Sequence, residues 1–270
     1  MKLGIIGTGM MGCSIGLRAR RNGVVVYGYD VDTAVGERAR VCGAINELVS
    51  RSDIYTRCDV VIIATHLDGT LAELARLQLK PQESTRLIID ISSTKKDVCE
   101  MATGLKNFIG THPMAGNELV GPEGANADLF EGRTWSYVPN SDENLNEHVR
   151  SFISDFGATP LAITAPEHDQ IVALTSHMPQ LFATLFAQRL NRQHSHQNAI
   201  ALCGPTAREL LRLKNSRFAM WGPILDANRE SVERVLREFA EDLLCTADAL
   251  RDRNETFLAA AFARAQITSL

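Results

Sequence analysis

A glycine-rich segment near the start of the chain constrains the fold more than any other feature. Residues 3–16 read LGIIGTGMMGCSIG, and Gly7, Gly9 and Gly12 form a GxGxxG pattern between a predicted strand and a predicted helix. Glycines in this pattern permit a tight turn, close approach of a pyrophosphate group and close packing of the helix on the strand. We therefore predict a dinucleotide-binding loop in which the cofactor also contacts the residues beside the glycines, Thr8, Met10 and Met11.

The residues after this loop indicate which dinucleotide binds. The run VVVYGYD ends at Asp30, 23 residues after Gly7. A carboxylate at the end of the second strand accepts hydrogen bonds from the ribose hydroxyls and repels a 2′-phosphate, so NAD is favoured over NADP. We assign Thr65, which follows a later predicted strand, and Ser92 to the same cofactor site. The alternative is a glycine-rich turn that binds no ligand.

Short apolar runs alternate with helical stretches over the first half of the chain. Such nearly continuous apolar runs are typical of strands that are covered on both faces. The alternation predicts βαβ units and a mainly parallel sheet, which is an α/β fold. The predicted strands are Lys2–Ile6, Val24–Tyr29, Asp59–Ala64, Leu87–Asp90 and Phe108–Gly110, and the helices between them include Met11–Asn22 and Thr33–Cys42.

The second half of the chain is predicted to be all helical. Glu167–Arg192 is apolar on more than one helical face, which predicts a long helix buried on several sides. Ser231–Leu250 has a clear helical period. A helical unit of this size does not bury so much apolar surface alone, so we expect a homodimer interface there, with a tightly packed monomer as the alternative. The predicted domains are 1–164, which binds the dinucleotide, and 165–270, which is helical.

Composition excludes several classes of partner. The formal net charge of −4 gives no electrostatic reason to expect nucleic acid or an anionic membrane as a partner. No apolar run approaches the roughly 20 residues that a membrane helix needs, and a first strand at Lys2 leaves no room for a signal peptide. The six cysteines are spread along the chain without a CxxC pair. This spacing predicts no metal site, and reduced, mostly buried thiols in a cytoplasmic protein.

Two polar blocks follow the fourth and fifth predicted strands. DISSTKKDV spans 90–98 and IGTHPMAGNE spans 109–118. Ligands of an open parallel sheet bind at the carboxyl ends of its strands, so Ser92 and His112 should meet near the nicotinamide. An imidazole is a suitable general base near neutral pH. The alternatives are a loop histidine that caps backbone groups and, for Ser92, an N-cap of a helix over 94–101.

Two further blocks, EHDQIVALTSHMPQ at 167–180 and KNSRFAMWGPILDANRE at 214–230, complete a pattern with the first two. In this order, the four blocks resemble the prephenate/arogenate dehydrogenase family, and the resemblance extends from residue 1 to about 250. It implies an N-terminal Rossmann domain followed by an all-helical dimerisation domain. It also implies NAD-dependent oxidative decarboxylation of prephenate, a small-molecule substrate, to 4-hydroxyphenylpyruvate in tyrosine biosynthesis.

The resemblance assigns roles to individual residues. His112 is implied to accept a hydrogen bond from the substrate hydroxyl, and Ser92 to support the same hydroxyl. Arg217 is our candidate for the substrate carboxylate, because a guanidinium group pairs bidentately with it. Substrate-binding roles are also implied for His177 and for Gln180, which stands where the family often has a second histidine. These assignments predict a site in the cleft between the two domains.

The two histidines of the predicted long helix are not expected to act together. His168 and His177 are nine residues apart, so about 180° separates them around an α-helix. We interpret His168, with Asp169, as structural residues near the helix start. His66 and Trp221 receive no firm role.

The choice of substrate stays open at this stage. Prephenate has a ketone where arogenate has an ammonium group, so a carboxylate at Glu118 would favour arogenate. We favour prephenate, the commoner substrate of NAD-linked members, and keep arogenate and an amino-substituted (amino-deoxyprephenate) analogue as alternatives. A β-hydroxyacid dehydrogenase relies on a lysine in a GxxxKxxN helix, whereas Lys214 is followed by NSR. A non-catalytic NAD-sensing protein would need the cofactor pattern without both His112 and Arg217.

Overall fold

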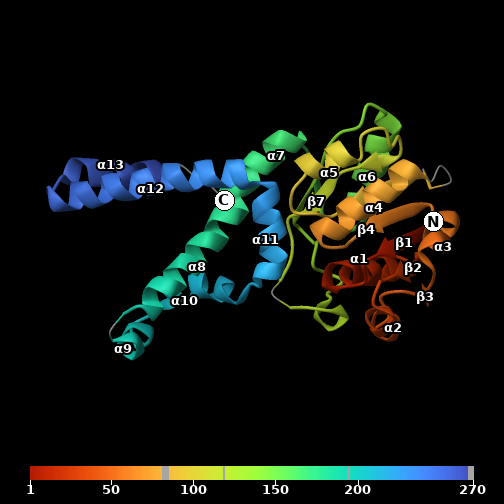
Figure 1. Ribbon diagram of the computed structural model, residues 1–270, viewed down its shortest axis with the longest axis horizontal. Coiled ribbons are helices and arrows are strands. Elements are labelled where there is room, and N and C mark those ends of the chain that lie inside the picture. The colour runs from red at the N-terminus through yellow and green to blue at the C-terminus, as the bar shows by residue number, and fades with distance from the viewer. Residues whose placement is uncertain (81–84, 118, 194, 267–270) are drawn as a thin grey trace.

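The structure is a computed structural model that describes residues 1–80, 85–117, 119–193 and 195–266. Figure 1 shows an α/β part that holds the N-terminus and a helical part that extends away from it. The sequence of elements agrees with the expected α/β fold followed by a helical domain.

A six-stranded sheet, counted over the described residues, forms the centre of the α/β part. Its strand order is β3-β2-β1-β4-β5-β6, and every pair is parallel. The order reverses between β1 and β4, and ligands of doubly wound sheets bind at such a point. The five predicted strands are confirmed, and β3 was not predicted. The strands are β1 (Lys2–Ile6), β2 (Val25–Tyr29), β3 (Glu47–Leu48), β4 (Val60–Ile63), β5 (Leu87–Asp90) and β6 (Phe108–Ile109).

Helices cover both faces of this sheet and enclose two hydrophobic clusters. Neighbouring residues of a strand point to opposite faces, so Ile5 belongs to one cluster and Ile6 to the other. Side-chain caps at Asp32, Ser50 and Asp142 satisfy first-turn N–H groups of three of the helices. The helices are α1 (Met10–Arg21), α2 (Thr33–Val41), α3 (Arg51–Arg57), α4 (Leu67–Leu79), α5 (Lys96–Met101) and α6 (Glu143–Asp155).

A second, three-stranded sheet was not predicted. Strand β7 (Thr111–Pro113) pairs antiparallel with β8 (Thr134–Tyr137), which pairs parallel with β9 (Thr159–Ala162). Only Gly110 separates β6 from β7, so the chain passes almost directly from one sheet to the other. A short 3-10 helix, η1 (Pro122–Gly124), lies in the connection between β7 and β8.

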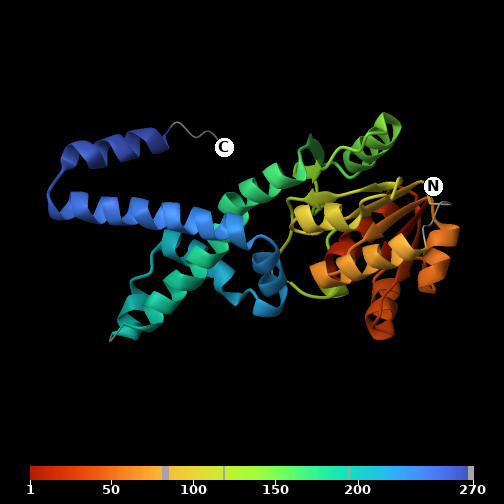
Figure 2. The same cartoon turned by 45° about the horizontal axis from the view of Figure 1, so that its top comes forward.

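The helical part begins at α7, whose N-terminus is capped by the Thr164 side chain. The single long helix predicted over 167–192 is in fact interrupted by a π-helical turn, η2, between α7 and α8. Figures 1 and 2 show α8 and α12 crossing, with α13 folded back beside α12. The elements are α7 (Ala165–Val172), η2 (Ala173–His177), α8 (Met178–Asn191), α9 (His196–Ala201), α10 (Pro205–Leu211), η3 (Arg212–Asn215), α11 (Phe218–Ala227), α12 (Arg229–Arg251) and α13 (Glu255–Ala265).

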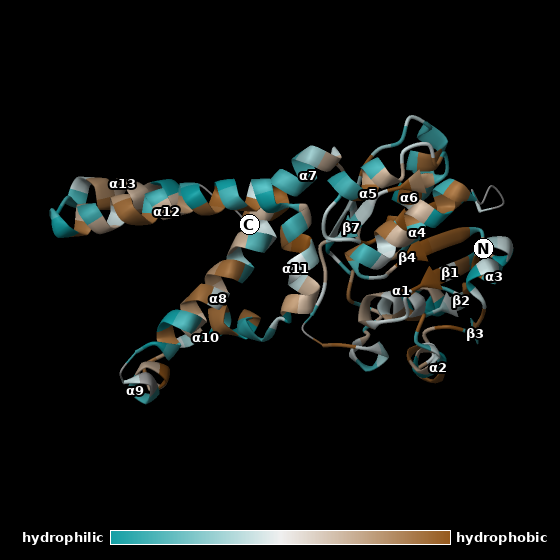
Figure 3. Ribbon diagram, in the orientation of Figure 1, coloured by the Kyte–Doolittle hydropathy of each residue, from teal (hydrophilic) through white to brown (hydrophobic). Residues whose placement is uncertain are grey.

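Two expectations about burial were wrong for the single chain. Helix α8 is not buried on several sides, because large apolar side chains of α8 and of the other helices of this part are exposed. Figure 3 shows the hydrophobic residues of these helices in brown. These exposed side chains include Leu174, Phe182, Leu185, Leu243, Leu244, Leu250 and Phe262. The six thiols are free but not mostly buried, since only Cys13 and Cys58 are buried. Within the described ranges, no helix is both long enough and apolar enough to cross a membrane.

Candidate active site

The glycine-rich loop between β1 and α1 has the backbone that pyrophosphate binding requires. Gly7 has φ of 93°, and a Cβ atom there would lie 2.6 Å from the Ala64 carbonyl oxygen. A Cβ atom on Gly12 would lie 2.1 Å from the Gly7 carbonyl oxygen, so neither position accepts a larger residue. At Gly9 a Cβ atom would meet no described atom within 4 Å, which leaves room above the loop.

The N-terminus of α1 begins at Met10 and Met11, directly beside this space. Within the described chain it has neither a side-chain cap nor an acidic residue in its first turn. Its first N–H groups and the positive end of its dipole are therefore available to an anionic group. This arrangement fits the pyrophosphate of a dinucleotide.

Asp30 ties the end of β2 to the glycine-rich loop. Its Oδ2 accepts hydrogen bonds from the Thr8 N–H at 2.8 Å and from the Thr8 hydroxyl at 3.1 Å. Its Oδ1 accepts a hydrogen bond from the Asp32 N–H at 3.0 Å. The carboxylate is thus held at the end of the second strand, where an acidic residue binds ribose hydroxyls in this fold. The residues present fit NAD.

A row of hydroxyl groups connects the ends of β4 and β5. Thr65 Oγ1 lies 3.0 Å from Thr70 Oγ1, and the Ser92 hydroxyl donates to Thr70 Oγ1 over 3.3 Å. The Ser92 N–H donates to the Asp90 carboxylate instead of belonging to a helix. Since α5 begins only at Lys96, the alternative that Ser92 caps this helix is wrong.

A buried ion pair that was not singled out in the sequence joins the ends of β5 and β7. The Lys95 ammonium group contacts the Asp90 carboxylate and donates to the Thr111 carbonyl oxygen at 2.7 Å. Asp90 Oδ1 in turn accepts a hydrogen bond from the Thr111 N–H at 3.0 Å, and the Trp135 indole N–H donates to the Thr111 hydroxyl. These contacts hold the residue before His112 firmly against the sheet.

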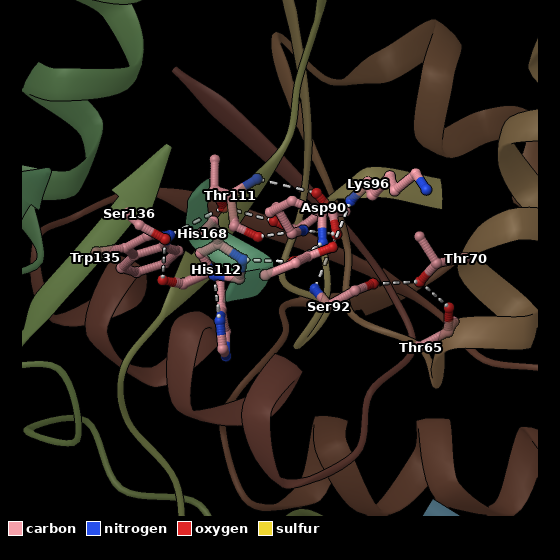
Figure 4. A network of polar contacts seen from close by, with 12 residues as sticks. Thr65, Thr70, Asp90, Ser92, Lys96, Thr111, His112, Trp135, Ser136 and His168 are labelled. Carbon is pink, nitrogen blue, oxygen red and sulfur yellow. Dashed lines mark hydrogen bonds and ion pairs between the residues drawn. The ribbon is translucent and has the colours of Figure 1, made fainter. Parts of the chain in front are cut away.

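His112 itself bonds to the helical part of the chain. Its Nδ1 lies 2.9 Å from Nε2 of His168 (Figure 4). His168 Nδ1 in turn lies 2.8 Å from the Asp169 carboxylate. The burial of the His112 ring, together with the Lys95 ammonium group nearby, holds the pKa of His112 well below its usual value. The imidazole is therefore uncharged at neutral pH, as a general base must be.

Asp169 links the helical part to the loop after β5. Its two oxygens accept hydrogen bonds from the N–H groups of Lys95 and Lys96, at 2.8 and 2.9 Å. Burial alone would raise the pKa of Asp169, but the hydrogen bonds with His168 and with these two N–H groups outweigh it and hold the pKa below its ordinary value. The interpretation of His168 and Asp169 as structural residues near the helix start therefore did not anticipate the hydrogen bond between His168 and His112.

His177 lies in the same polar cluster, contrary to the expected separation of about 180° from His168. The π-helical turn between them takes more residues per turn than an α-helix, which changes the angle between the two side chains. The Asn228 amide nitrogen donates to the Asp169 carbonyl oxygen at 2.7 Å and lies 3.3 Å from His177 Nδ1. Both histidines are therefore linked to Asp169, His168 directly and His177 through Asn228.

The contacts of Asn228 also define the protonation of His177. Because the Asp169 carbonyl oxygen only accepts, the amide group that faces it is the NH₂, and its second hydrogen is directed to His177 Nδ1. The His177 proton is then on Nε2, which is buried and has no partner among the described residues, as is also true of the Trp221 indole nitrogen. Burial lowers the pKa of His177 to about 4, so this N–H donor is uncharged.

The remaining predicted residues lie farther along the chain. Gln180 is buried, and its amide is occupied by the chain itself: it donates to the Leu213 carbonyl oxygen at 2.9 Å and accepts from the Ser216 hydroxyl at 3.1 Å. Arg217 follows this loop directly, at the N-terminus of α11, with an exposed side chain. Glu118 lies outside the described residues.

Strand β7, which follows β6 almost directly, brings an uncharged imidazole to the carboxyl end of the parallel sheet, where the nicotinamide of a bound dinucleotide would lie. This is the arrangement of a dinucleotide-dependent dehydrogenase. Comparison with known families is more specific. Residues 15–160 match the model of the prephenate dehydrogenase nucleotide-binding domain, and residues 164–264 match that of the prephenate dehydrogenase dimerization domain. The chain belongs to the prephenate dehydrogenase family.

Individual relatives agree with this membership. A probable prephenate dehydrogenase of Streptomyces niveus is 30% identical over 254 residues, which cover 92% of this chain and 68% of that protein. The chain spans about two thirds of the length of the curated relatives that it matches first.

Two solved structures have the same fold. Prephenate dehydrogenase from Aquifex aeolicus, in complex with hydroxyphenyl propionate and NAD+, matches with a TM-score of 0.88 and 23% identity over 99% of this chain and 96% of that one. Synechocystis arogenate dehydrogenase matches with a TM-score of 0.83 and 22% identity, over 98% of each chain.

Proposed function

We propose that this protein catalyses the NAD-dependent oxidative decarboxylation of prephenate to 4-hydroxyphenylpyruvate, a step of tyrosine biosynthesis. The observation that carries the proposal is the uncharged, half-buried imidazole of His112, which belongs to the same network of polar contacts as Ser92 (Figure 4). Membership of the prephenate dehydrogenase family and the NAD+ complex of the similar A. aeolicus enzyme support the same reaction.

The residues of the site match the charge movements of this reaction. His112 takes the proton of the ring hydroxyl while Ser92 binds the same oxygen, so that the oxygen becomes a carbonyl. NAD+, when bound, accepts the hydride from the carbinol carbon. The ring carboxylate then leaves as CO₂, its bonding electrons complete the aromatic ring, and the proton held by His112 returns to the phenolic oxygen. General base catalysis of this kind contributes about 10²- to 10⁴-fold.

Arg217 binds a carboxylate of the substrate in this proposal. Its exposed guanidinium group lies at the start of α11, a helix that also contacts α4 of the nucleotide-binding domain. Arginine fixes both the charge and the orientation of a carboxylate through two parallel hydrogen bonds. His177 and Gln180 support the same part of the site, His177 as an uncharged donor and Gln180 through the loop before Arg217.

The state of His177 favours prephenate over arogenate. An uncharged His177 whose Nε2 carries a hydrogen can donate to the ketone oxygen of prephenate, whereas the ammonium group of arogenate offers it no acceptor at that position. Arogenate and an amino-substituted analogue are the alternative substrates. Because the chain is similar to Synechocystis arogenate dehydrogenase, arogenate is included in the turnover experiment below.

The quaternary structure that we propose is a homodimer formed through the helical part, in the cytoplasm. The exposed apolar side chains of α8, α12 and α13 support it, because a soluble monomer rarely exposes so many together. The match of residues 164–264 to a dimerization domain supports it independently.

Turnover with defined substrates tests the proposal. Purified protein is incubated with prephenate or arogenate and with NAD+ or NADP+, and the absorbance of the reduced cofactor is followed. We expect the highest kcat/KM for prephenate with NAD+. Higher kcat/KM with arogenate would transfer the assignment to that substrate, and no turnover in any of the four combinations would refute the proposed function.

A further inference from the structure

We propose that His168 and Asp169 are positioning residues that hold His112 in the tautomer whose Nε2 carries a free lone pair for the substrate hydroxyl. Nothing in the composition of the GTHPMAG block indicates which nitrogen of His112 acts as the base. The three side chains form a continuous hydrogen-bonded row from the Asp169 carboxylate to the reacting imidazole. Figure 4 shows the two histidines of this row. The role in catalysis rests on the proposed function, whereas the tautomer does not.

Asp169 determines which nitrogen of His168 carries the hydrogen. Its carboxylate already accepts the N–H groups of Lys95 and Lys96 and therefore acts only as an acceptor. The third contact, to His168 Nδ1 at 2.8 Å, then requires the hydrogen to be on Nδ1. Because His168 is buried, with 2% of its surface exposed, no solvent competes for this bond.

The tautomer of His168 in turn determines which nitrogen of His112 carries the hydrogen. A neutral His168 with its hydrogen on Nδ1 has a lone pair on Nε2, and this atom lies 2.9 Å from His112 Nδ1. His112 Nδ1 must therefore carry the hydrogen, and His112 Nε2 is left with the lone pair. A doubly protonated His168 would reverse this second bond and leave His112 Nε2 protonated, unable to act as a base.

The row also stabilises His112 after proton transfer. When Nε2 takes the substrate proton, the imidazole becomes cationic, and its Nδ1–H bond to His168 becomes charge-assisted, with the Asp169 carboxylate behind it. His112 comes from β7 of the nucleotide-binding domain and His168 from α7 of the helical part. The base is thus oriented by the second domain, to which Asp169 is anchored through the loop after β5.

The tautomer can be measured without any turnover. The full-length protein, labelled with ¹⁵N in its histidine side chains, is studied at a pH near 7.5 by long-range ¹H–¹⁵N NMR, and the His112 signals are identified by their loss in His112→Asn. We expect a protonated Nδ1 and an unprotonated Nε2 for His112, and a protonated Nδ1 for His168. A His112 ring protonated on Nε2 would overturn the inference.

Two substitutions at His168 test its role in the reaction. In His168→Gln, the amide NH₂ can donate to Asp169 and the amide oxygen can accept from His112, whereas His168→Leu does neither. We expect His168→Leu to lower kcat by about 10- to 100-fold, as for loss of a hydrogen bond to a group that becomes charged, with KM for NAD+ unchanged. His168→Gln should recover most of kcat, and Glu167→Gln, an exposed neighbour on α7, serves as the control.

The outcomes separate this inference from the proposed function. Equal loss of kcat in His168→Gln and His168→Leu, or no loss in either, would contradict a positioning role. If His168→Leu does not fold, the kcat of His168→Gln relative to the native protein and the NMR result still test the positioning role of His168. If the native protein turns over none of the substrates, the proposed function fails while the NMR experiment still tests the tautomer.

Discussion

Lys95 and Asp90 form an ion pair in which neither side chain is exposed to solvent. Asp90 ends β5 and Lys95 lies in the loop that follows it, and the pair also binds the backbone of Thr111 on β7. The pair therefore holds together the end of the parallel sheet and the strand that carries His112.

Removal of the Lys95 ammonium group should cost much more stability than removal of a neighbouring charge. Lys95→Met leaves the Asp90 carboxylate buried without its partner, which costs about 3–5 kcal/mol. Lys96→Met is the matched control, because Lys96 is exposed, and we expect a change within about 0.5 kcal/mol. Urea denaturation measures the free energy of unfolding of both variants. Similar stabilities of the two variants would show that the buried pair is not important for folding.

Substitution of the base should affect turnover but not cofactor binding. His112→Asn retains a polar side chain of similar size but cannot take the hydroxyl proton at neutral pH. We expect kcat to fall by about 10²- to 10⁴-fold with an unchanged Kd for NAD+. Steady-state kinetics with prephenate and a binding titration with NAD+ check the two parts. A variant with full kcat would exclude His112 as the base.

Arg217→Lys should weaken substrate binding while leaving the cofactor site intact. Lysine keeps the positive charge but loses the bidentate geometry with a carboxylate. We expect a rise in KM for prephenate of about tenfold or more, since hydrogen bonds to charged groups contribute about 1.5–3 kcal/mol. KM for NAD+ is the internal control. An unchanged KM for prephenate would remove this residue from the site.

Gln180 should act on the substrate through the loop before Arg217. Gln180→Met breaks the hydrogen bonds to Leu213 and Ser216, so we expect a higher KM for prephenate. In combination with Arg217→Lys the two effects should be less than additive, because both act on the same guanidinium position. The control is Thr184→Val, which loses only a bond to the carbonyl oxygen of its own helix. Additive effects would indicate that Gln180 contacts the substrate independently.

Acid should destabilise the protein partly through His177. Its pKa is about 4 in the folded protein and near 6.5 when unfolded, so the unfolded state binds more protons between these values. The free energy of unfolding should therefore decrease as the pH falls through this window, by up to about 3 kcal/mol from this group at about 1.4 kcal/mol per pKa unit.

Other titrating groups can be separated from His177 in this measurement. His112 contributes in the same direction, because its pKa is also lowered, whereas the contribution of Asp169 is lost only at lower pH, below its unfolded value near 3.8. Urea denaturation of the native protein and of His177→Gln across the window isolates the effect. An equally steep pH dependence in the variant would contradict the assignment to His177.

The nucleotide-binding half was largely predictable because its signals are local. The glycine spacing, the carboxylate at Asp30 and the apolar strands each depend on residues that are near one another in the sequence. The small second sheet escaped prediction because its strands are short. One of them, β9, contains Pro160 and is mostly exposed, so it lacks the apolar pattern of a core strand.

The polar cluster of the site was predictable only in part. His112 and Ser92 follow from the rule that ligands bind at the carboxyl ends of parallel strands. The bond between His112 and His168 joins residues 56 positions apart and depends on how the two domains pack, whereas the place of His177 depends on the π-helical turn. A regular α-helix assumed from periodicity places His168 and His177 on opposite sides, which is why their shared surroundings were missed.

The most direct test of the central claim compares two products of one reaction. Prephenate labelled in its ring carboxylate is incubated with NAD+, and labelled CO₂ and reduced cofactor are measured in the same sample. An oxidative decarboxylation predicts equal amounts of the two at every time, with both lost together in His112→Asn. Reduced cofactor formed without CO₂ would contradict the account, because it would identify a simple alcohol dehydrogenase on the same fold.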